Sequence, residues 1–230
     1  MIRTLLNDFL HLFFPHVCLL CGRPLVEGEH EICLACLHGQ PHTGFEQQPD
    51  NRMEQLFWGR TPAVDRAAAL FYFEKGSQVQ QLIHQLKYRN HPEIGRILGR
   101  YAARRMRGSG LSQADAVVPV PLHRKRLRQR GYNQSTLIAE GLTQIWGIPV
   151  EEGLLERTHA NVSQTHKGVY ERWENTHELF RVSQPERYRG KTLLLVDDVV
   201  TTGSTLGAAA QALSAIPDVR IRCFSLAIAR

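Results

Sequence analysis

Hydrophobic and polar positions follow two alternating periods from residue 63 to residue 230. Four apolar runs have the length and composition of β-strands: AAALFYFE, ADAVVPVPL, KTLLLVDDVV and VRIRCFSLAIA. Apolar residues at helical spacing mark the segments between them: SQVQQLIHQLKYRN, residues 92–107, NQSTLIAEGLTQIWG and STLGAAAQALSAI. Strands that alternate with helices predict an α/β fold, with a parallel sheet that carries helices on both faces.

Single residues at the ends of these segments support the assignment. Ser77 is placed to cap the first helix, Pro92 suits the first turn of the second, and Gly147 ends the third. The unbroken apolar run Leu193–Val196 predicts a central strand that is buried on both faces. In such sheets the ligand binds beyond the carboxyl ends of the strands, so residues that follow these runs are the candidates for chemistry.

The chain before residue 63 has a different pattern. Residues 1–14 place five Leu and Phe side chains on one broad face, which predicts an amphipathic helix. Asp8 and the lack of a small-residue cleavage site argue against a secretory signal. Residues 46–62 show no clean period and are interpreted as a connector. Because no run of about eighteen apolar residues occurs, the sequence predicts no transmembrane helix, and a cytoplasmic location is expected.

Four of the five cysteines lie in two Cys-x-x-Cys pairs, with eleven residues between the pairs. Two thiolates in one tight turn bind a single ion, and a second such turn completes a tetrahedral site. The predicted ligands of a structural Zn²⁺ are therefore Cys18, Cys21, Cys33 and Cys36. Disulfide bonds and a redox motif are the alternatives; a reducing cytoplasm argues against the first, and the duplication of the pair argues against the second. Cys223 lies in an apolar strand and is interpreted as core.

Charge is divided unevenly along the chain. The whole sequence has a formal net charge of +6, but residues 1–62 hold four Lys/Arg against seven Asp/Glu, a net charge of −3. Residues 63–230 therefore carry +9, and an anionic partner is expected to meet this part. Together with the cysteines, the patterns divide the chain into an N-terminal helix and zinc-binding module (1–45), the connector (46–62) and an α/β domain (63–230).

The stretch LLLVDDVVTTGST, residues 193–205, joins an acid pair to a turn rich in hydroxyl groups. Asp197 and Asp198 are expected where the strand leaves the sheet, with their carboxylates directed to a ligand and not to the core. Gly203 lets the backbone approach closely, and free N–H groups at the start of the next helix favour a phosphate. Further donors are the hydroxyl groups of Thr201, Thr202, Ser204 and Thr205. Since the lysine of a nucleoside-triphosphate loop is absent, a phosphorylated polyol is the predicted ligand; the alternative is an ordinary strand–turn–helix corner.

This stretch resembles the phosphoribosyl-diphosphate binding motif of the type I phosphoribosyltransferases. The resemblance implies that Asp197 and Asp198 are catalytic residues that contact the ribose hydroxyls, and that Thr201 through Thr205 hold the 5′-phosphate. The wider chain is similar to the ComF/GntX family in VPVPLHRKRLRQRGYNQS (118–135), in LIHQLKYRN (82–90) and in the two cysteine pairs. That family has a double zinc ribbon-like module before a phosphoribosyltransferase domain, and some members are linked to competence and DNA uptake. This sequence departs from the pattern in having a compact module with one set of four cysteines.

The run HRKRLRQRG holds five Lys/Arg between residues 124 and 130, after the strand that ends near Val120. At a second strand end these cations are expected near the diphosphate of the same ligand, with Arg124, Arg126 and Arg130 as its binding residues. Two alternatives stay open. One is a solvated arginine-rich turn, and the other is a track for the backbone of single-stranded nucleic acid, with stacking on Tyr132, Tyr170 or Trp173.

Residues 157–180 are polar and without a clear period, which is typical of a lid or a mobile segment. The family resemblance implies a flexible loop over the reaction centre, and it includes the spacing of Arg157, Gln164, Arg172, Asn175 and Phe180. His159 and His166 are interpreted as facing solvent.

Two functional hypotheses follow. In the first, the protein is a phosphoribosyltransferase that binds phosphoribosyl diphosphate with Mg²⁺ and works by positioning and charge stabilisation on an unknown acceptor. In the second, it is a non-catalytic protein that handles single-stranded DNA together with other DNA-uptake proteins, and phosphoribosyl diphosphate is a ligand or sensor.

Overall fold

A computed structural model of the protein describes residues 16–89, 91–158 and 179–230. The amphipathic helix predicted for residues 1–14 lies outside the described residues, as do His159, His166, Tyr170 and Trp173. No helix in the described part of the chain is both long and apolar enough to cross a membrane.

Four parallel strands form the central sheet, as the alternating pattern predicted. Their order across the sheet is β1 (Val64–Phe73), β6 (Arg220–Ala229), β5 (Thr192–Val200) and β2 (Ala116–Pro119). Residues Leu193–Val196 of β5 are wholly buried, which confirms a central strand covered on both faces. Cys223 in β6 is also wholly buried and belongs to the core, as predicted.

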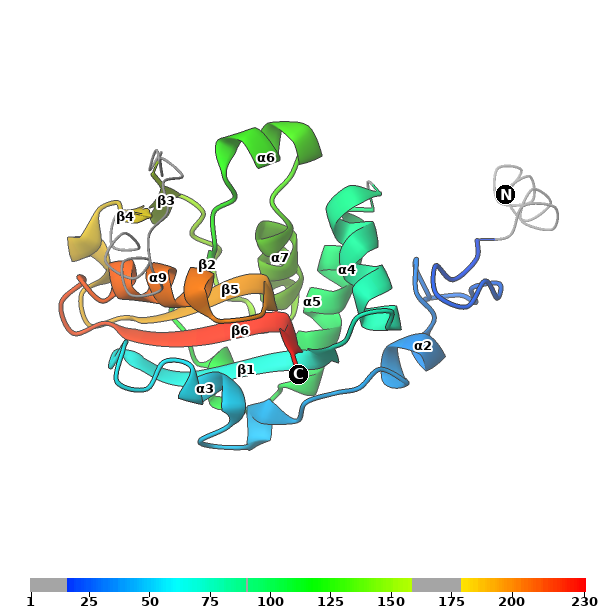
Figure 1. The fold of residues 1–230 in the computed structure, drawn as a ribbon, viewed down its shortest axis with the longest axis horizontal. Coiled ribbons are helices and arrows are strands. Elements are labelled where there is room, and N and C mark those ends of the chain that lie inside the picture. Colours follow the sequence, from blue (N-terminus) through cyan, green and yellow to red (C-terminus); the bar gives the residue numbers. More distant parts are fainter. Residues whose placement is uncertain (1–15, 90, 159–178) are drawn as a thin grey trace, which may run out of the picture.

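Helices cover both faces of this sheet. Figure 1 shows α4 (Gln78–Tyr88), α5 (Glu93–Arg105) and α7 (Gln134–Trp146) together on one side, and α9 (Ser204–Leu213) on the other. Ser77 caps α4 by accepting the N–H of Gln80, and Gly147 closes α7 in the left-handed conformation. Pro92 precedes α5 as its N-cap, one residue earlier than expected.

Two glycines bring α5 and α7 into backbone contact. A Cβ atom on Gly99 would lie 2.9 Å from the Cα atom of Gly141, so larger residues would force the helices apart. This close packing fixes α7, and the first residues of α7 reach the far end of β5.

The basic run forms a short helix, α6 (Arg124–Arg130), and not a turn. The His123 side chain accepts the N–H of Lys125 at its start, and Gly131 ends it with φ of 84°. No residue of α6 is buried, and Figure 1 shows the helix standing away from the sheet beyond α7. This stretch shows no helical period because nearly every position is charged or polar.

The segment before β1, which was interpreted as a connector, contains two short helices. It contains η1 (Phe45–Gln47) and α3 (Arg52–Gln55), and Met53 is wholly buried against the sheet. Hydrogen bonds of Asn51 fix the short helix α3 against β1. Oδ1 of Asn51 accepts the N–H groups of Met53 and Glu54, and its Nδ2 donates to the carbonyl of Ala67 in β1 at 2.9 Å. A helix of four residues is too short to show a period.

The remaining elements are small. They are α2 (Leu34–His38), η2 (Gly110–Ser112), η3 (Pro185–Tyr188) and the antiparallel pair β3 (Leu155–Arg157) and β4 (Phe180–Val182). The pair β3–β4 holds the two ends of the predicted loop, whose residues 159–178 lie outside the described part of the chain.

Candidate functional site

The acid pair lies in the part of β5 that extends beyond the end of the neighbouring strand β2. Pro119, the last residue of β2, is in register with Val196, whereas β5 stays paired with β6 as far as Val200. Asp197 and Asp198 are therefore still inside a strand, but on the β2 side the edge of β5 is open. The first turn of α7 closes this edge with Gln134 and Ser135.

Asp198 is buried, with 4% of its surface exposed. Its Oδ1 accepts a hydrogen bond from Nζ of Lys87 at 2.8 Å, and its Oδ2 accepts one from Nε2 of Gln134 at 2.6 Å. The expectation that both carboxylates point away from the core is wrong for Asp198. The side chain of Asp198 lies against α4 and α7, whose residues Lys87 and Gln134 supply its donors. The buried charge is tolerated because it is paired.

Asp197 is partly exposed, and its environment is different. Its Oδ1 accepts hydrogen bonds from Oγ of Ser135 at 3.1 Å and from the backbone N–H of Asp198 at 2.9 Å. Burial, and after it the neighbouring charge of Asp198, raise the pKa of Asp197 from 3.8 to about 7. Asp197 thus gains or loses its charge close to neutral pH.

The turn after β5 presents an open start of α9. Gly203 is the N-cap residue, with φ of 75°, and offers no side chain to the N–H groups of the first turn. The hydroxyls of Thr202 and Ser204 lie 2.8 Å apart, and both residues are exposed. Thr201 is also exposed, and Thr205 is partly so. The N–H of Ser204 donates to Oγ1 of Thr202 at 3.4 Å, a long hydrogen bond that a ligand can replace. A helix start whose N-cap residue makes no side-chain cap, with exposed hydroxyls beside it, suits a phosphate group.

Gly203→Ala is expected to weaken phosphate binding and to destabilise the fold by about 1–2 kcal/mol, the cost of a left-handed residue with a Cβ atom. The new Cβ would also lie 3.2 Å from Cδ1 of Leu56. Calorimetry with ribose 5-phosphate and thermal melting measure the two effects. The control is Gly207→Ala in the same helix, where a Cβ meets no atom within 4 Å and alanine favours the helix. Equal behaviour of the two variants would contradict a special role for Gly203.

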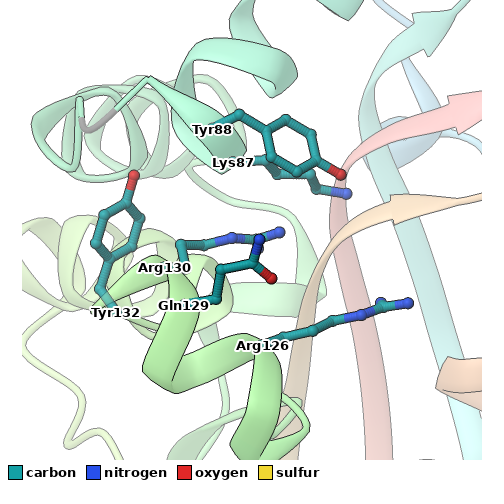
Figure 2. A pocket seen from close by; sticks show the side chains of 6 residues that line it. All are labelled: Lys87, Tyr88, Arg126, Gln129, Arg130 and Tyr132. Atoms are coloured by element: carbon teal, nitrogen blue, oxygen red, sulfur yellow. The ribbon is translucent and has the colours of Figure 1, made fainter.

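A basic pocket of about 500 Å³ lies between the end of α4 and α6. Its lining residues are Lys87, Tyr88, Arg126, Gln129, Arg130 and Tyr132. Figure 2 shows Lys87, Arg126, Gln129 and Arg130 extending from the two helices into the same space. The guanidinium of Arg130 lies 5.4 Å from the centre of the Tyr88 ring, and the Tyr132 hydroxyl donates to the carbonyl of Leu86 at 2.6 Å.

The other predicted cations of α6 are placed differently. Arg124, at the start of the helix, does not line the basic pocket. Its charge lies near Glu156, whose pKa is lowered first by the hydrogen bond from Arg181 and more weakly by Arg124. Lys125 and Arg128 are exposed. The structure thus separates the cations that the sequence had grouped, because only Arg126 and Arg130 share the pocket face of the helix.

Arg157, at the end of β3, adds a further positive charge to the site. Burial and the nearby charge of Arg126 lower the pKa of Arg157, whereas Asp197 raises it. Arg157 therefore lies within electrostatic reach of both the acid pair and α6. Two guanidinium groups held near each other favour a bound anion, because an anion relieves their repulsion.

The four paired cysteines converge, as predicted. Their sulfur atoms lie within 4.8 Å of one another, and none of the five cysteines forms a disulfide. Zn–S bonds of about 2.3 Å in a tetrahedron separate the sulfurs by about 3.8 Å. The Sγ atoms of Cys21 and Cys33 are 3.8 Å apart, so the cluster has the dimensions of a zinc site. Burial raises the pKa of Cys18, but the N–H groups of Cys33, Cys21 and Leu20 outweigh it and lower this pKa to about 6. Burial and the neighbouring cysteines raise the pKa of Cys36, so it is the geometry of the four sulfurs that indicates a zinc site.

Comparison with known proteins agrees with this geometry. The family model for the phosphoribosyl transferase domain matches residues 84–227. Among solved structures, adenine phosphoribosyltransferase from Leishmania tarentolae has a TM-score of 0.41 and 12% identity, over 73% of this chain and 92% of that one. The structural likeness is too low to support a conclusion by itself.

Three curated relatives span most of the chain. DNA utilization protein YhgH of Salmonella typhi is 31% identical over 215 residues, 86% of this chain and 91% of that protein. Competence protein F of Haemophilus influenzae is 27% identical over 231 residues, 94% of this chain and 98% of that protein. The chain belongs to the ComF family. Competence protein ComFC of Bacillus subtilis is 25% identical over 198 residues, and the match covers 86% of this chain and 71% of that protein.

Membership of the ComF family agrees with the fold of the described residues. The fold is the predicted one, a parallel-sheet type I phosphoribosyltransferase fold preceded by a small module with four clustered cysteines. Three polar residues around the acid pair had no assigned role in the sequence, namely Lys87, Gln134 and Ser135. All three lie in the stretches that resemble the ComF family, and only that resemblance pointed to them.

Proposed function

We propose that this chain binds phosphoribosyl diphosphate at the carboxyl end of β5 and transfers its phosphoribosyl group to an acceptor that is still unidentified. The observation that carries the proposal is the position of the acid pair, directly before the open, glycine-led start of α9. Acids that accept hydrogen bonds from ribose hydroxyls and a helix start that binds a phosphate match the two ends of a 5-phosphoribosyl group.

Each part of the site has a proposed role. Asp197 and Asp198 accept hydrogen bonds from the ribose hydroxyls, and residues Thr201–Thr205 hold the 5′-phosphate. Arg126 and Arg130 bind the diphosphate, and Arg157 supports the same negative charge. Because displacement at the anomeric carbon passes through a cationic sugar, the residues contribute by holding the reacting groups and by placing charge. Arg124 is expected to contribute least, since it does not line the pocket.

Two metal ions belong to this proposal. Mg²⁺ would be bound mainly by diphosphate and ribose oxygens and would neutralise the leaving group. Zn²⁺ would be held by the four clustered cysteines, which fill all four positions of a tetrahedral site and so give it a structural role. None of the five cysteines forms a disulfide bond, which is consistent with a reducing compartment, and we propose a cytoplasmic location.

Calorimetry with phosphoribosyl diphosphate and Mg²⁺, followed by a diphosphate-release assay over a panel of acceptors, tests the proposal. Binding with release supports a transferase. Binding without release by any acceptor supports a protein that uses phosphoribosyl diphosphate as a ligand. Absence of binding contradicts the site itself.

A second candidate function is the handling of single-stranded DNA, alone or with other DNA-uptake proteins. Two relatives are named for DNA utilization and competence. In this chain the exposed cations of α6 favour it, because Lys125 and Arg128 lie outside the basic pocket and are accessible to a phosphate backbone. Tyr132 is a weaker stacking candidate than the sequence indicated, since it is partly buried and its hydroxyl is bonded to Leu86.

Two matched double variants separate these functions. Lys125→Gln with Arg128→Gln is expected to reduce the salt dependence of single-stranded DNA binding by about 1.4 in log–log slope, roughly 0.7 for each lost phosphate contact. Its affinity for phosphoribosyl diphosphate should stay as in the wild type. Arg126→Gln with Arg130→Gln is expected to lose that affinity instead. Fluorescence anisotropy over a range of salt concentrations and calorimetry measure both. A wild-type protein that does not bind single-stranded DNA at low salt would exclude the second function.

A further inference from the structure

Lys87 belongs to two parts of the site at once. Its Nζ donates to Oδ1 of Asp198 at 2.8 Å, and the same side chain lines the basic pocket with Arg126 and Arg130. Figure 2 shows its terminal nitrogen at the side of the pocket nearest the sheet. Among the residues that the structure describes, Lys87 thus both pairs with Asp198 and lines the basic pocket.

In the free protein this ion pair competes with the sugar. Both oxygens of Asp198 already accept hydrogen bonds, one from Lys87 and one from Gln134, and only 4% of the residue is exposed. Each oxygen has a second lone pair, but the burial of Asp198 leaves no open approach to it beside these donors. A ribose hydroxyl therefore reaches Asp198 by replacing one of them. The Gln134 side chain is buried on α7, whereas Lys87 has a flexible side chain with 22% of its surface exposed. Lys87 is the donor that can leave.

The pocket gives the ammonium group another place to bind. Nη1 of Arg130 is buried and has no hydrogen-bond partner among the residues that the structure describes. A buried donor without an acceptor points to an anion as the ligand that completes the pocket. Such an anion, with several negative charges, would attract Lys87 as well as the two arginines.

We propose that Lys87 couples the two halves of the site: a diphosphate in the basic pocket draws the Lys87 ammonium away from Asp198 and so releases that carboxylate for the ribose hydroxyls. The proposal rests on the proposed binding of phosphoribosyl diphosphate and assigns Lys87 as a positioning residue within it. The backbone around Lys87 needs no movement. The carbonyl of Leu86 is held by Tyr132, and the ring of Tyr88 lies against Arg130, so the side chain alone changes position.

Coupling of this kind is reciprocal and can be measured with two separate ligands. Ribose 5-phosphate is titrated into the protein with Mg²⁺, with and without saturating inorganic diphosphate. In the wild type, diphosphate is expected to tighten the binding of ribose 5-phosphate about fivefold or more. In Lys87→Met, which keeps an unbranched side chain one atom shorter and removes its charge, diphosphate binds more weakly through the two arginines and the ratio falls to about one. Lys75→Met, at an exposed lysine outside the pocket, should keep the wild-type ratio.

The outcomes distinguish this inference from the proposed function. If Lys87 were merely an additional cation, Lys87→Met would weaken diphosphate binding and retain the coupling, which would overturn the proposal. Wild-type protein that binds both ligands without coupling overturns it too, and leaves the proposed function intact. Wild-type protein that binds neither ligand contradicts the proposed function itself.

A structure of the wild type with inorganic diphosphate and Mg²⁺ provides a second measurement that does not depend on the folding of a variant. The distance from Nζ of Lys87 to Oδ1 of Asp198 is expected to exceed roughly 4 Å, the limit of an ion pair. If diphosphate occupies the pocket and the distance stays at 2.8 Å, the inference is wrong.

Discussion

Asp197→Asn is expected to weaken binding of phosphoribosyl diphosphate about 10- to 150-fold, because a charged acceptor of hydroxyl hydrogen bonds contributes about 1.5–3 kcal/mol per bond. The same substitution is expected to stabilise the fold at pH 8. Oδ1 of asparagine can still accept from Ser135 and from the N–H of Asp198. The substitution removes a carboxylate whose ionised form is disfavoured by burial and by the charge of Asp198, and so removes a cost to folding.

The stabilisation should depend on pH in a defined direction. The pKa of Asp197 rises from 3.8 to about 7 on folding. Between these values the folded protein retains a proton that the unfolded chain has released, so stability falls as pH rises through this window. The wild type thus carries the full cost at pH 8 and little of it near pH 4. We expect Asp197→Asn to raise the melting temperature by roughly 2–4 °C at pH 8, the effect of about 1 kcal/mol in a domain of this size, and by less at pH 5.

Asp218→Asn is the matched control, since Asp218 is exposed and its φ of 58° suits asparagine as well as aspartate. It should bind phosphoribosyl diphosphate like the wild type and have the wild-type melting temperature at pH 5 and at pH 8. Unchanged affinity in Asp197→Asn would remove Asp197 from the ribose site. A gain in melting temperature of equal size at pH 5 and pH 8 would show that the carboxylate charge is not its cause.

The sequence predicted the parts of this fold that depend on local pattern. The run Leu193–Val196 was recognisable as a central strand because a strand covered on both faces has no polar positions. The cysteine cluster was predictable because each ligand pair lies within one turn of the chain. In both cases the deciding residues are neighbours in the sequence.

Contacts between segments that are distant in the sequence could not be predicted from local patterns. Lys87 and Asp198 are 111 residues apart, and nothing in the pattern of α4 distinguishes a lysine that pairs with a buried acid from one in solvent. The burial of Asp198 could not be predicted either, because it also depends on segments that are distant in the sequence. A strand end is expected to be open, but here α4 and α7 extend past the end of β2 and enclose one of the two acids.

The largest structural effect is expected from Cys33→Ser, which removes one of the four clustered sulfurs at a wholly buried position. Structural Zn²⁺ contributes about 10 kcal/mol or more to the folding of small zinc modules, so its loss should open the module. Amide exchange at Leu19 and Leu25, which donate to Glu31 and His16, should rise by about 100-fold or more. Elemental analysis should find one Zn²⁺ per wild-type chain and none in the variant.

The matched control is Cys223→Ala, which alters a buried cysteine in β6, outside the cluster, and should retain the zinc. The sheet of Cys33→Ser is expected to stay folded and to melt cooperatively, because its four strands pair with one another. The module meets the sheet along β1, where His42 bridges Phe71, and this contact lies outside the cysteine cluster. The melting temperature of the variant should nevertheless fall, since the buried residues Ile32 and Leu37 are continuous with the core of the sheet. Zinc in neither protein would refute the metal assignment. Zinc loss without faster exchange at Leu19 and Leu25 would show that the module folds without its ion.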